Sequence, residues 1–234
     1  MTDIGELRRL AGRDSLLAAL PEEGARKVVA LGKPRKFARG EALFQQGDAG
    51  DCAYLILTGA VKISVVSAAG REIVFAYLSV GDLVGDISVL DERPRTASAT
   101  AAEAVNTLVI MGADLQRLIA DAPELASAVI RFLCARLRST NELLESDRSF
   151  QTGPRLARGI LRLLREHGHG EGESAERIDF AISQTDLGAF VSLSRENVSR
   201  QLKDWSRAGL LELKAGKIIV KDREALEEAA EGEF

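Results

Sequence analysis

The sequence predicts an α+β fold in three parts: an N-terminal antiparallel β-roll, a long central helix, and a C-terminal group of two short helices and a hairpin. Three patterns predict it. Glycines separate short strand-like runs between residues 36 and 111, glycine is then absent from residues 123–148, and two serines precede helical patterns within residues 182–222. We therefore expect domains at residues 1–122, 123–152 and 153–234.

The composition is that of a globular protein without a membrane anchor. Of the 234 residues, 46% are hydrophobic and 28% are charged, with a net charge of −4, which is an ordinary balance. No apolar run approaches the ~18 residues that cross a bilayer, and MTDIGELRRL lacks the apolar core of a signal peptide. The two cysteines, Cys52 and Cys134, are too few for a disulfide framework. A cytoplasmic location is therefore expected.

The first 122 residues predict short helices followed by the roll. Apolar positions within residues 1–31 are interrupted by Pro21 and Gly24, as expected of short helices. Strand-like runs follow at residues 53–57, 60–66, 72–78 and 107–111, with glycines at positions 47, 59, 70, 81 and 85. Short strands with a turn signal every dozen residues or so are typical of a small antiparallel barrel or roll.

A helix of roughly 25 residues, ~38 Å long, is predicted between Pro123 and Arg148. Its seam has the alternating spacing of three and four residues found in a coiled coil. The seam positions are Ile130, Leu133, Leu137, Thr140 and Leu144. Charged residues flank this narrow stripe, which favours pairing with a second copy over burial on the helix's own domain. We therefore expect a homodimer through residues 123–148, with a polar point at Thr140 and Asn141.

The segment REHGHGEGES, residues 165–174, is predicted to be a solvated loop. It follows a helix expected over residues 154–166 and contains the only two histidines of the chain, His167 and His169. No nearby acid or cysteine completes a tetrahedral ligand set, so we expect no metal site there.

The segment ISQTDLGAFVSLSRENVSRQLKDWSRAGLLELKAGKIIVKD, residues 182–222, carries the most specific pattern. Ser183 and Asp186 form a capping box, which begins a helix ending near Val191, and Ser194 caps a second helix. Winding the second helix at ~100° per residue separates two faces. The polar face holds Arg195, Glu196, Ser199, Arg200 and Lys203; the apolar face holds Val198, Leu202 and Trp205. Two short strands around residues 215–216 complete a winged helix-turn-helix, whose second helix is expected in the major groove.

The polar face suits the reading of base edges. Arginine donates two parallel bonds to guanine O6 and N7, and glutamate accepts from cytosine N4. Residues 181–223 carry eight Lys or Arg against five Asp or Glu, a local charge of +3 in an acidic protein. Any charged surface helix would show such an arc, but the capping box, short turn and hairpin together favour DNA binding.

A glycine-punctuated roll, a dimer helix and a helix-turn-helix reading SRENVSR together resemble the CRP/FNR family of bacterial transcription regulators. The resemblance covers residues 37–222. It implies that Arg195, Glu196 and Arg200 read bases. It places Ser183, Thr185, Ser194 and Lys203 near the DNA backbone. It also implies RNA polymerase as a partner and a palindromic DNA site resembling TGTGA–TCACA. The bases at the centre of each half-site stay open, because Ser199 also matches the oxygen-sensing branch of the family.

In that family, the segment resembling GDISVLDERPRTA, residues 85–97, is the phosphate-binding cassette of a cyclic-nucleotide domain. Free amides after Gly85 suit an anion, as at any helix N-terminus, Arg95 offers a forked cation for a phosphodiester, and Thr96 adds a hydroxyl. The resemblance implies cyclic AMP as an effector, with Thr140 and Asn141 at the purine, the second from the partner subunit. The expected ligand-binding residues are Gly85, Asp86, Ile87, Ser88, Arg95, Thr96, Ala97, Thr140 and Asn141.

Asp86 departs from the family's cyclic AMP receptors, which carry glutamate at this position. Aspartate has roughly 1.5 Å less reach, which leaves three alternatives. Asp86 binds the ribose 2′-hydroxyl after a loop shift or through water, it caps the short helix, or it pairs with Arg95 in an empty pocket. Cyclic GMP stays open because Thr96 and Asn141 also suit guanine. A constitutive regulator, or one that responds to another anion such as cyclic di-GMP, stays open as well.

Other functions fit the residues poorly. An iron–sulfur cluster requires about four cysteines, and the two histidines lie in the predicted loop, where they are poorly placed for a haem. The sequence contains no evident nucleophile–base set and no Gly-Lys-Ser/Thr phosphate loop. No enzymatic activity is therefore predicted.

Overall fold

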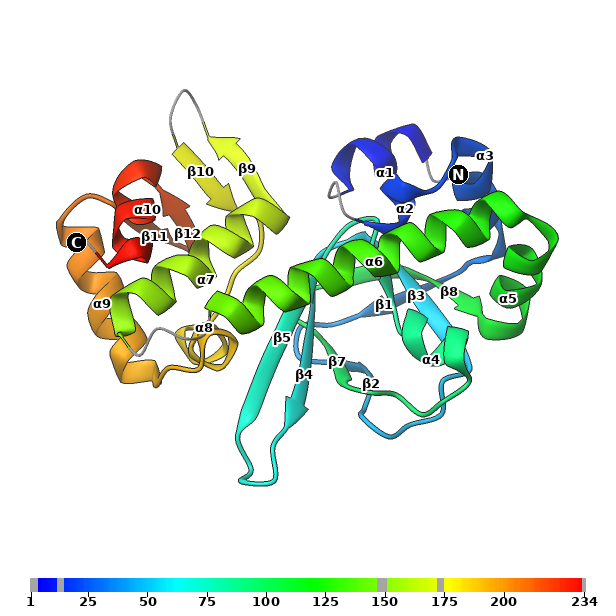
Figure 1. Cartoon of the computed structure of the whole chain (residues 1–234), viewed down its shortest axis with the longest axis horizontal. Helices are drawn as coiled ribbons and strands as arrows, with labels where there is room; N and C mark the ends of the chain where they lie inside the picture. The colour runs from blue at the N-terminus through cyan, green and yellow to red at the C-terminus, as the bar shows by residue number, and fades with distance from the viewer. Residues whose placement is uncertain (1–3, 12–14, 147–150, 172–174, 233–234) are drawn as a thin grey trace. The chain divides into compact units, whose positions relative to one another are not determined.

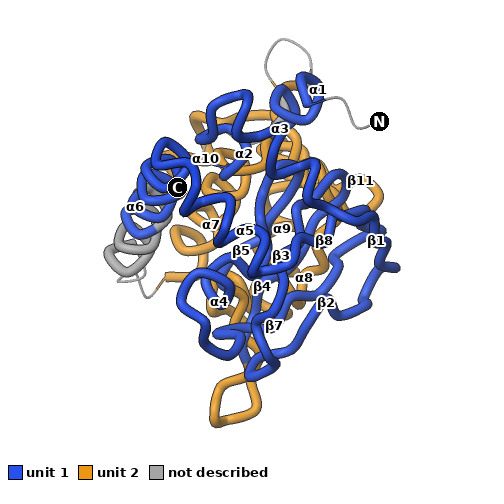
Figure 2. Tube along the Cα trace, turned by 90° about the vertical axis from the view of Figure 1, so that its right-hand side faces the viewer, with its two compact units in different colours: residues 1–65, 75–139 blue, residues 66–74, 140–234 orange. Residues whose placement is uncertain are grey.

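The computed structural model describes residues 4–11, 15–146, 151–171 and 175–232. The chain divides into two compact units: residues 1–65 with 75–139, and residues 66–74 with 140–234, drawn in blue and orange in Figure 2. Helices and antiparallel sheets occur in both, which confirms the predicted α+β fold.

Three short helices begin the first unit, as predicted: α1 (Ile4–Leu10), α2 (Leu16–Ala19) and α3 (Glu22–Leu31). Ser15 caps α2 by accepting a 3.2 Å hydrogen bond from the Ala18 amide, and Pro21 is the N-cap residue of α3. The buried residues of these helices lie in one apolar cluster with residues of the roll.

The roll consists of two four-stranded sheets, with strand orders β1-β8-β3-β6 and β2-β7-β4-β5 (Figure 1). Their strands are β1 (Lys33–Phe37), β2 (Ala42–Phe44), β3 (Cys52–Thr58), β4 (Val61–Val66), β5 (Glu72–Leu78), β6 (Leu83–Val84), β7 (Ser98–Ala101) and β8 (Val105–Met111). The four predicted runs correspond to β3, β4, β5 and β8. The other four strands were not predicted, because they are short or highly charged.

Strand β3 is buried on both faces, which explains its nearly continuous apolar sequence. Ala53 and Leu55 lie in the cluster that includes the N-terminal helices, whereas Tyr54 and Ile56 lie in the second cluster, inside the roll. Because side chains alternate along a strand, Cys52 falls on the same side as Tyr54 and joins the second cluster.

Three further helices belong to this part of the chain: α4 (Asp86–Asp91), α5 (Gly112–Asp121) and α6 (Pro123–Ser146). The long helix is confirmed, and it has two apolar faces. Leu125 and Phe132 are buried in the first unit's core, whereas Ile130 and Leu137 are each 61% exposed. The side chains of Thr140 and Asn141 lie outside the described part of the structure.

The second unit contains the predicted winged helix-turn-helix. Its elements are α7 (Thr152–His167), β9 (Gly168–Glu171), β10 (Ala175–Ile178), α8 (Gln184–Val191), α9 (Arg195–Arg207), β11 (Leu211–Lys214), β12 (Lys217–Val220) and α10 (Arg223–Glu231). The wing strands β11 and β12 continue into a four-stranded sheet of order β11-β12-β10-β9.

The prediction of a solvated loop at residues 165–174 is wrong for residues 165–171, and residues 172–174 lie outside the described part of the structure. His167 ends α7 with only 7% of its surface exposed, and its ring meets Phe180 edge-on at 5.3 Å. His169 lies in β9, opposite Arg177 of β10. The polar, glycine-rich sequence does not predict β9, because the strand is stabilised by pairing with β10, which in turn pairs with β12.

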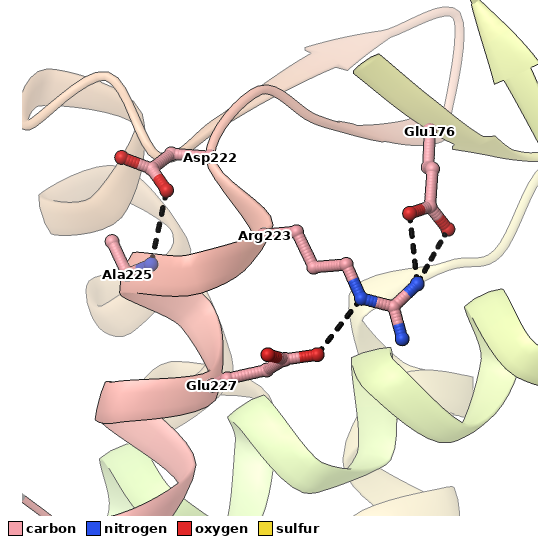
Figure 3. Close-up of polar contacts among 5 residues, drawn as sticks. All are labelled: Glu176, Asp222, Arg223, Ala225 and Glu227. Carbon is pink, nitrogen blue, oxygen red and sulfur yellow. Dashed lines mark hydrogen bonds and ion pairs between the residues drawn. The ribbon is translucent and has the colours of Figure 1, made fainter. Parts of the chain in front are cut away.

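Arg223 connects α10 to the sheet of the second unit (Figure 3). Its Nη1 donates to both carboxylate oxygens of Glu176 on β10, at 2.8 and 3.0 Å. Its Nε donates at 2.8 Å to Glu227, one turn further along α10. Asp222 caps the same helix by accepting from the Ala225 amide at 3.0 Å.

The described residues contain neither a membrane-spanning helix nor a cluster of metal ligands. None of their helices has the length and apolar character that crossing a bilayer requires. Within the same residues, no group of three or more His, Cys, Asp or Glu side chains is placed to hold a metal ion.

Candidate functional site

Gly85 forms a left-handed turn between β6 and the short helix α4. Its φ is +84° and it is the N-cap residue of the helix. A Cβ at this position would lie 2.4 Å from Nη1 of Arg95, well inside contact distance. Glycine is therefore required both for the backbone conformation and for the approach of the guanidinium.

The Arg95 side chain is buried, with 3% of its surface exposed. Its Nη1 donates to the Gly85 carbonyl at 2.9 Å, and its Nη2 donates to the Cys52 carbonyl at 2.5 Å. The guanidinium carbon also lies 4.2 Å from the centroid of the Phe44 ring. Two backbone carbonyls and an aromatic ring thus hold this cation. None of these three contacts is with an anionic group.

One donor of Arg95 is unused. Its Nε is buried and has no hydrogen-bond partner among the described residues. A buried polar group without a partner costs free energy, on the order of 1–3 kcal/mol and more for a charged group. An anionic acceptor at this point would remove that cost, so the donor set fits a phosphate or phosphodiester.

Asp86 occupies the first position of α4, and its side chain is 4% exposed. Asp86 therefore starts the helix, as one alternative proposed, although Gly85 is the N-cap residue. Asp86 also lines a small cavity whose other lining residues are apolar, among them Leu90 of α4 and Phe132 of α6.

The remaining cassette residues lie on α4 and on the segment that leads to β7. Ser88 is buried, and its hydroxyl donates at 3.5 Å to the Pro94 carbonyl. Ala97 is 8% exposed and Ile87 is 37% exposed, and Thr96 is exposed. The structure thus brings α4 and the Arg95 segment together at two points, Gly85 and Ser88.

Two residues that contact Arg95, Phe44 and Cys52, were not predicted from the sequence. The Cys52 sulfur lies 3.8 Å from Nη2 of Arg95, and burial raises the pKa of the Cys52 thiol, so it stays protonated at neutral pH. The sequence contains no signal for either contact, because each residue is 40 or more positions away from Arg95 and lies in a strand whose pairing is non-local.

The helix-turn-helix is built as predicted. The Ser183 hydroxyl accepts from the Asp186 amide at 3.0 Å, and the Ser194 hydroxyl accepts from the Asn197 amide at 3.2 Å. The turn between α8 and α9 is tight, since a Cβ on Gly188 would lie 2.6 Å from the Leu193 carbonyl oxygen.

The two predicted faces of α9 are confirmed. Val198, Leu202 and Trp205 are at most 2% exposed. The opposite face lines an open hollow of about 450 Å³, and its residues are Arg195, Glu196, Ser199, Arg200, Lys203, Asp204 and Arg207. Asp204 and Arg207 were not predicted as members of this face, although the same winding of ~100° per residue places Arg207 within its arc and Asp204 about 40° beyond it.

Hydrogen bonds and charges near α9 keep the carboxyl group of Glu196 ionised. Hydrogen bonds from the backbone amide of Glu196 itself and from the Ser194 hydroxyl lower the pKa of the Glu196 carboxyl group below its usual value, and Arg195 adds to the effect. Arg200 donates at 2.7 Å to the side-chain oxygen of Asn197, one turn earlier. Thr185 is exposed on the first turn of α8. The face of α9 thus offers basic donors beside two acidic side chains, Glu196 and Asp204.

Two family models match the chain, and together they cover both units. The model described as "Cyclic nucleotide-binding domain" matches residues 34–122. The model described as "Crp-like helix-turn-helix domain" matches residues 154–229. The first range includes Gly85 and Arg95, and the second includes all of α8 and α9.

Similar proteins extend the match across the chain. The "CRP-like cAMP-activated global transcriptional regulator" of Mycobacterium tuberculosis is 34% identical over 195 residues, which cover 83% of this chain and 86% of that protein. The "Cyclic AMP receptor protein" of Thermus thermophilus is 34% identical over 198 residues, which cover 85% and 88%. The solved structure of FixK2 from Bradyrhizobium japonicum has the same fold, with a TM-score of 0.74 at 20% identity, covering 85% of this chain and 96% of that one.

Proposed function

The chain belongs to the CRP/FNR family of DNA-binding transcriptional regulators and contains its cyclic-nucleotide-binding domain, and from that premise we propose that cyclic AMP sets its affinity for DNA. The proposed ligand site is the cassette of residues 85–97, together with Thr140 and Asn141. The proposed domains are residues 1–122, 123–152 and 153–234.

The observation that carries the ligand proposal is the unused Nε donor of the buried Arg95. In this proposal, Arg95 and the amides after Gly85 bind the cyclic phosphodiester, and Asp86 accepts from the ribose hydroxyl. Cyclic AMP is favoured over cyclic GMP because the names of two relatives at 34% identity specify cyclic AMP. Thr96, which is exposed beside Arg95, suits either base.

We further propose a homodimer through α6. Ile130 and Leu137 lie seven residues apart on one face of the helix, and each is 61% exposed. Large apolar side chains at that spacing form the seam of a two-stranded coiled coil. In such a dimer, Thr140 and Asn141 follow at the seam, where a ligand contact changes how the two helices pack.

The proposed DNA contact is made by the polar face of α9. Arg195, Glu196 and Arg200 read base edges there, and Lys203 contacts a phosphate. Two copies of α9 placed ~34 Å apart would enter successive major grooves of a palindromic site, for which TGTGA–TCACA is the proposed sequence. The proposed gating element is the hinge near residues 150–153, of which Phe150 lies outside the described residues. RNA polymerase is the proposed partner on promoter DNA.

A constitutive regulator is the second candidate. One observation favours it: Asp86 shares its cavity with apolar side chains such as Leu90 and Phe132, surroundings that are poor for a carboxylate that must meet a ribose. In that case the protein would bind DNA equally well without a nucleotide. Cyclic di-GMP is a different candidate effector, and the titration described next tests it as well.

Calorimetric titration of the wild type and Arg95→Ala with cyclic AMP, cyclic GMP and cyclic di-GMP tests the proposal. We expect cyclic AMP to bind the wild type best, and Arg95→Ala to lose at least ~2 kcal/mol of binding free energy. Arg93→Ala, an exposed arginine two residues away, is the matched control and should bind as the wild type does. Binding of cyclic AMP without formation of 5′-AMP is expected. A wild type that binds no cyclic nucleotide would favour the constitutive candidate.

A further inference from the structure

We propose that Phe44 is a positioning residue for the ligand site: its ring holds the Arg95 guanidinium in the plane from which the free donor meets the phosphate. The inference rests on the proposed function, because it assigns to Phe44 a part of that site's affinity. Neither the sequence pattern nor the family models assign a role to this side chain.

The guanidinium carbon of Arg95 lies over the ring of Phe44. The guanidinium carbon lies 4.2 Å from the ring centroid, within the ~6 Å range of a cation–π interaction. An aromatic ring binds the flat face of the cation, whereas hydrogen bonds use the N–H groups in its plane. A ring in this role leaves the in-plane donors available.

Two of the three guanidinium nitrogens donate to backbone carbonyls, and the third has no partner among the described residues. Nη1 donates to the Gly85 carbonyl and Nη2 to the Cys52 carbonyl, while Nε has no partner among the described residues. Two hydrogen bonds to carbonyls and the contact with the ring hold the guanidinium in place. The cation is thus positioned before a ligand arrives, and such preorganisation lowers the cost of binding.

The fold in turn holds the Phe44 ring. Phe44 ends β2, which pairs with β7 through a register irregularity between Ala42 and Phe44. The Tyr54 ring lies 6.0 Å from the Phe44 ring at an interplanar angle of 32°, and the Tyr54 hydroxyl donates at 3.4 Å to the Leu43 carbonyl. Tyr54 of β3 thus supports the strand and the ring that carry the contact.

The same ring also approaches the turn at Gly85. The Cε1 atom of Phe44 would be 3.2 Å from a Cβ at Gly85, and the guanidinium carbon of Arg95 would be at the same distance. Phe44, Gly85 and Arg95 therefore meet at one point, where the absence of a side chain on Gly85 leaves room for the stacked pair.

The experiment compares Phe44→Leu with a matched core variant, Phe37→Leu. Phe37 belongs to the same apolar cluster and meets Tyr54 edge-on at 5.7 Å. The cation over the Phe37 ring is Arg35, whereas Arg95 lies over the Phe44 ring. Cyclic AMP affinity is measured by calorimetry for the wild type, both variants, Arg95→Lys and the double variant Phe44→Leu/Arg95→Lys. Thermal unfolding without ligand reports the structural cost of each substitution.

We expect Phe44→Leu to weaken cyclic AMP binding about tenfold, which lies between the sizes of an exposed and a desolvated cation–π contact. Phe37→Leu should change it less than about twofold, although both variants lower the melting temperature. On the Arg95→Lys background, Phe44→Leu should add less than about a twofold loss, since residues in contact are non-additive. Equal losses for the two leucine variants, or a full tenfold loss on the lysine background, would show a merely structural role and overturn the inference.

The outcomes separate this inference from the proposed function. If Arg95→Lys loses affinity and Phe44→Leu does not, only the role of Phe44 falls. If the wild type binds no cyclic nucleotide, or if Arg95→Lys binds cyclic AMP as tightly as the wild type does, both the proposed ligand site and the role of Phe44 are contradicted.

Discussion

Nη1 of Arg95 donates a 2.9 Å hydrogen bond to the carbonyl of Gly85, so the buried cation and the left-handed turn before α4 hold each other in place. The two residues are ten positions apart, and each limits what the other can be. A side chain on Gly85 would collide with the guanidinium, and without the guanidinium the Gly85 carbonyl would lose this donor. The predictions for the first unit follow from this pair.

Gly85→Ala should weaken cyclic AMP binding more than tenfold and lower the free energy of unfolding by roughly 1–2 kcal/mol. Gly40→Ala is the control, since Gly40 has a similar φ of +81° but open space around its Cβ. That variant should show the backbone strain alone and keep its nucleotide affinity. Calorimetry and urea unfolding of both variants check the prediction. Equal affinities for Gly85→Ala and Gly40→Ala would contradict it.

Tyr54→Phe should change how stability depends on alkaline pH. Burial raises the pKa of Tyr54 to about 12, above the value of about 10 for an exposed tyrosine. The folded protein therefore keeps a proton that the unfolded chain loses, and this stabilisation is full below pH ~10 and disappears as pH rises from ~10 through ~12. The stability difference between wild type and Tyr54→Phe should fall by on the order of 1–2 kcal/mol over that interval. Urea unfolding at a series of pH values measures it, and a constant difference would be the contrary result.

Lys203→Ala should reduce the salt dependence of DNA binding. A lysine that neutralises one phosphate contributes about 0.9 to the slope of log K against log salt, so a dimer should lose about 1.8. Lys27→Ala, an exposed lysine of α3 paired with Glu23, is the control and should leave the slope unchanged. Fluorescence anisotropy of a labelled duplex at several salt concentrations gives both slopes. An unchanged slope for Lys203→Ala would remove Lys203 from the DNA contact.

Glu196→Gln should relax base preference at one position of each half-site. Because the pKa of Glu196 is lowered, its carboxylate is ionised at neutral pH and accepts from cytosine N4, a contact worth about 1–3 kcal/mol of discrimination. The ratio of the affinity for an operator with a C·G pair at the position read by Glu196 to the affinity for an operator without it should therefore differ between wild type and variant. The ratio for the wild type should stay constant from pH 6 to 8. Identical ratios for the two proteins would exclude base reading by Glu196.

Arg223→Ala should lower the free energy of unfolding of the second unit by about 1 kcal/mol, because it removes a network rather than a single exposed pair. The network joins β10 and α10 through Glu176 and Glu227 (Figure 3). Lys221→Ala breaks only one exposed pair, with Glu212 at 3.4 Å, and should cost less than about 0.5 kcal/mol. Denaturant unfolding followed by the single tryptophan, Trp205, compares the two variants. A larger cost for Lys221→Ala would refute the network's role.

Local patterns in the sequence were enough to predict much of this fold. Serine caps, the winding of α9 and the glycine-separated strands depend on neighbouring residues, so Ser183, Ser194 and the buried face around Val198 could be predicted. Strands β9 and β10 could not, because their pairing depends on β12, some forty residues later. The same holds for the proposed ligand site. Arg95 was proposed from its local sequence, whereas its contacts with Phe44 and Cys52 depend on strands that are distant in the sequence.

Binding to a palindromic duplex, at one fixed salt concentration, with and without saturating cyclic AMP, is the most direct test of ligand-gated DNA recognition. The account predicts that cyclic AMP tightens binding by about 5- to 150-fold, a coupling of roughly 1–3 kcal/mol, and that Arg95→Ala abolishes this change. Equal affinity of the wild type for the duplex in both conditions would contradict it.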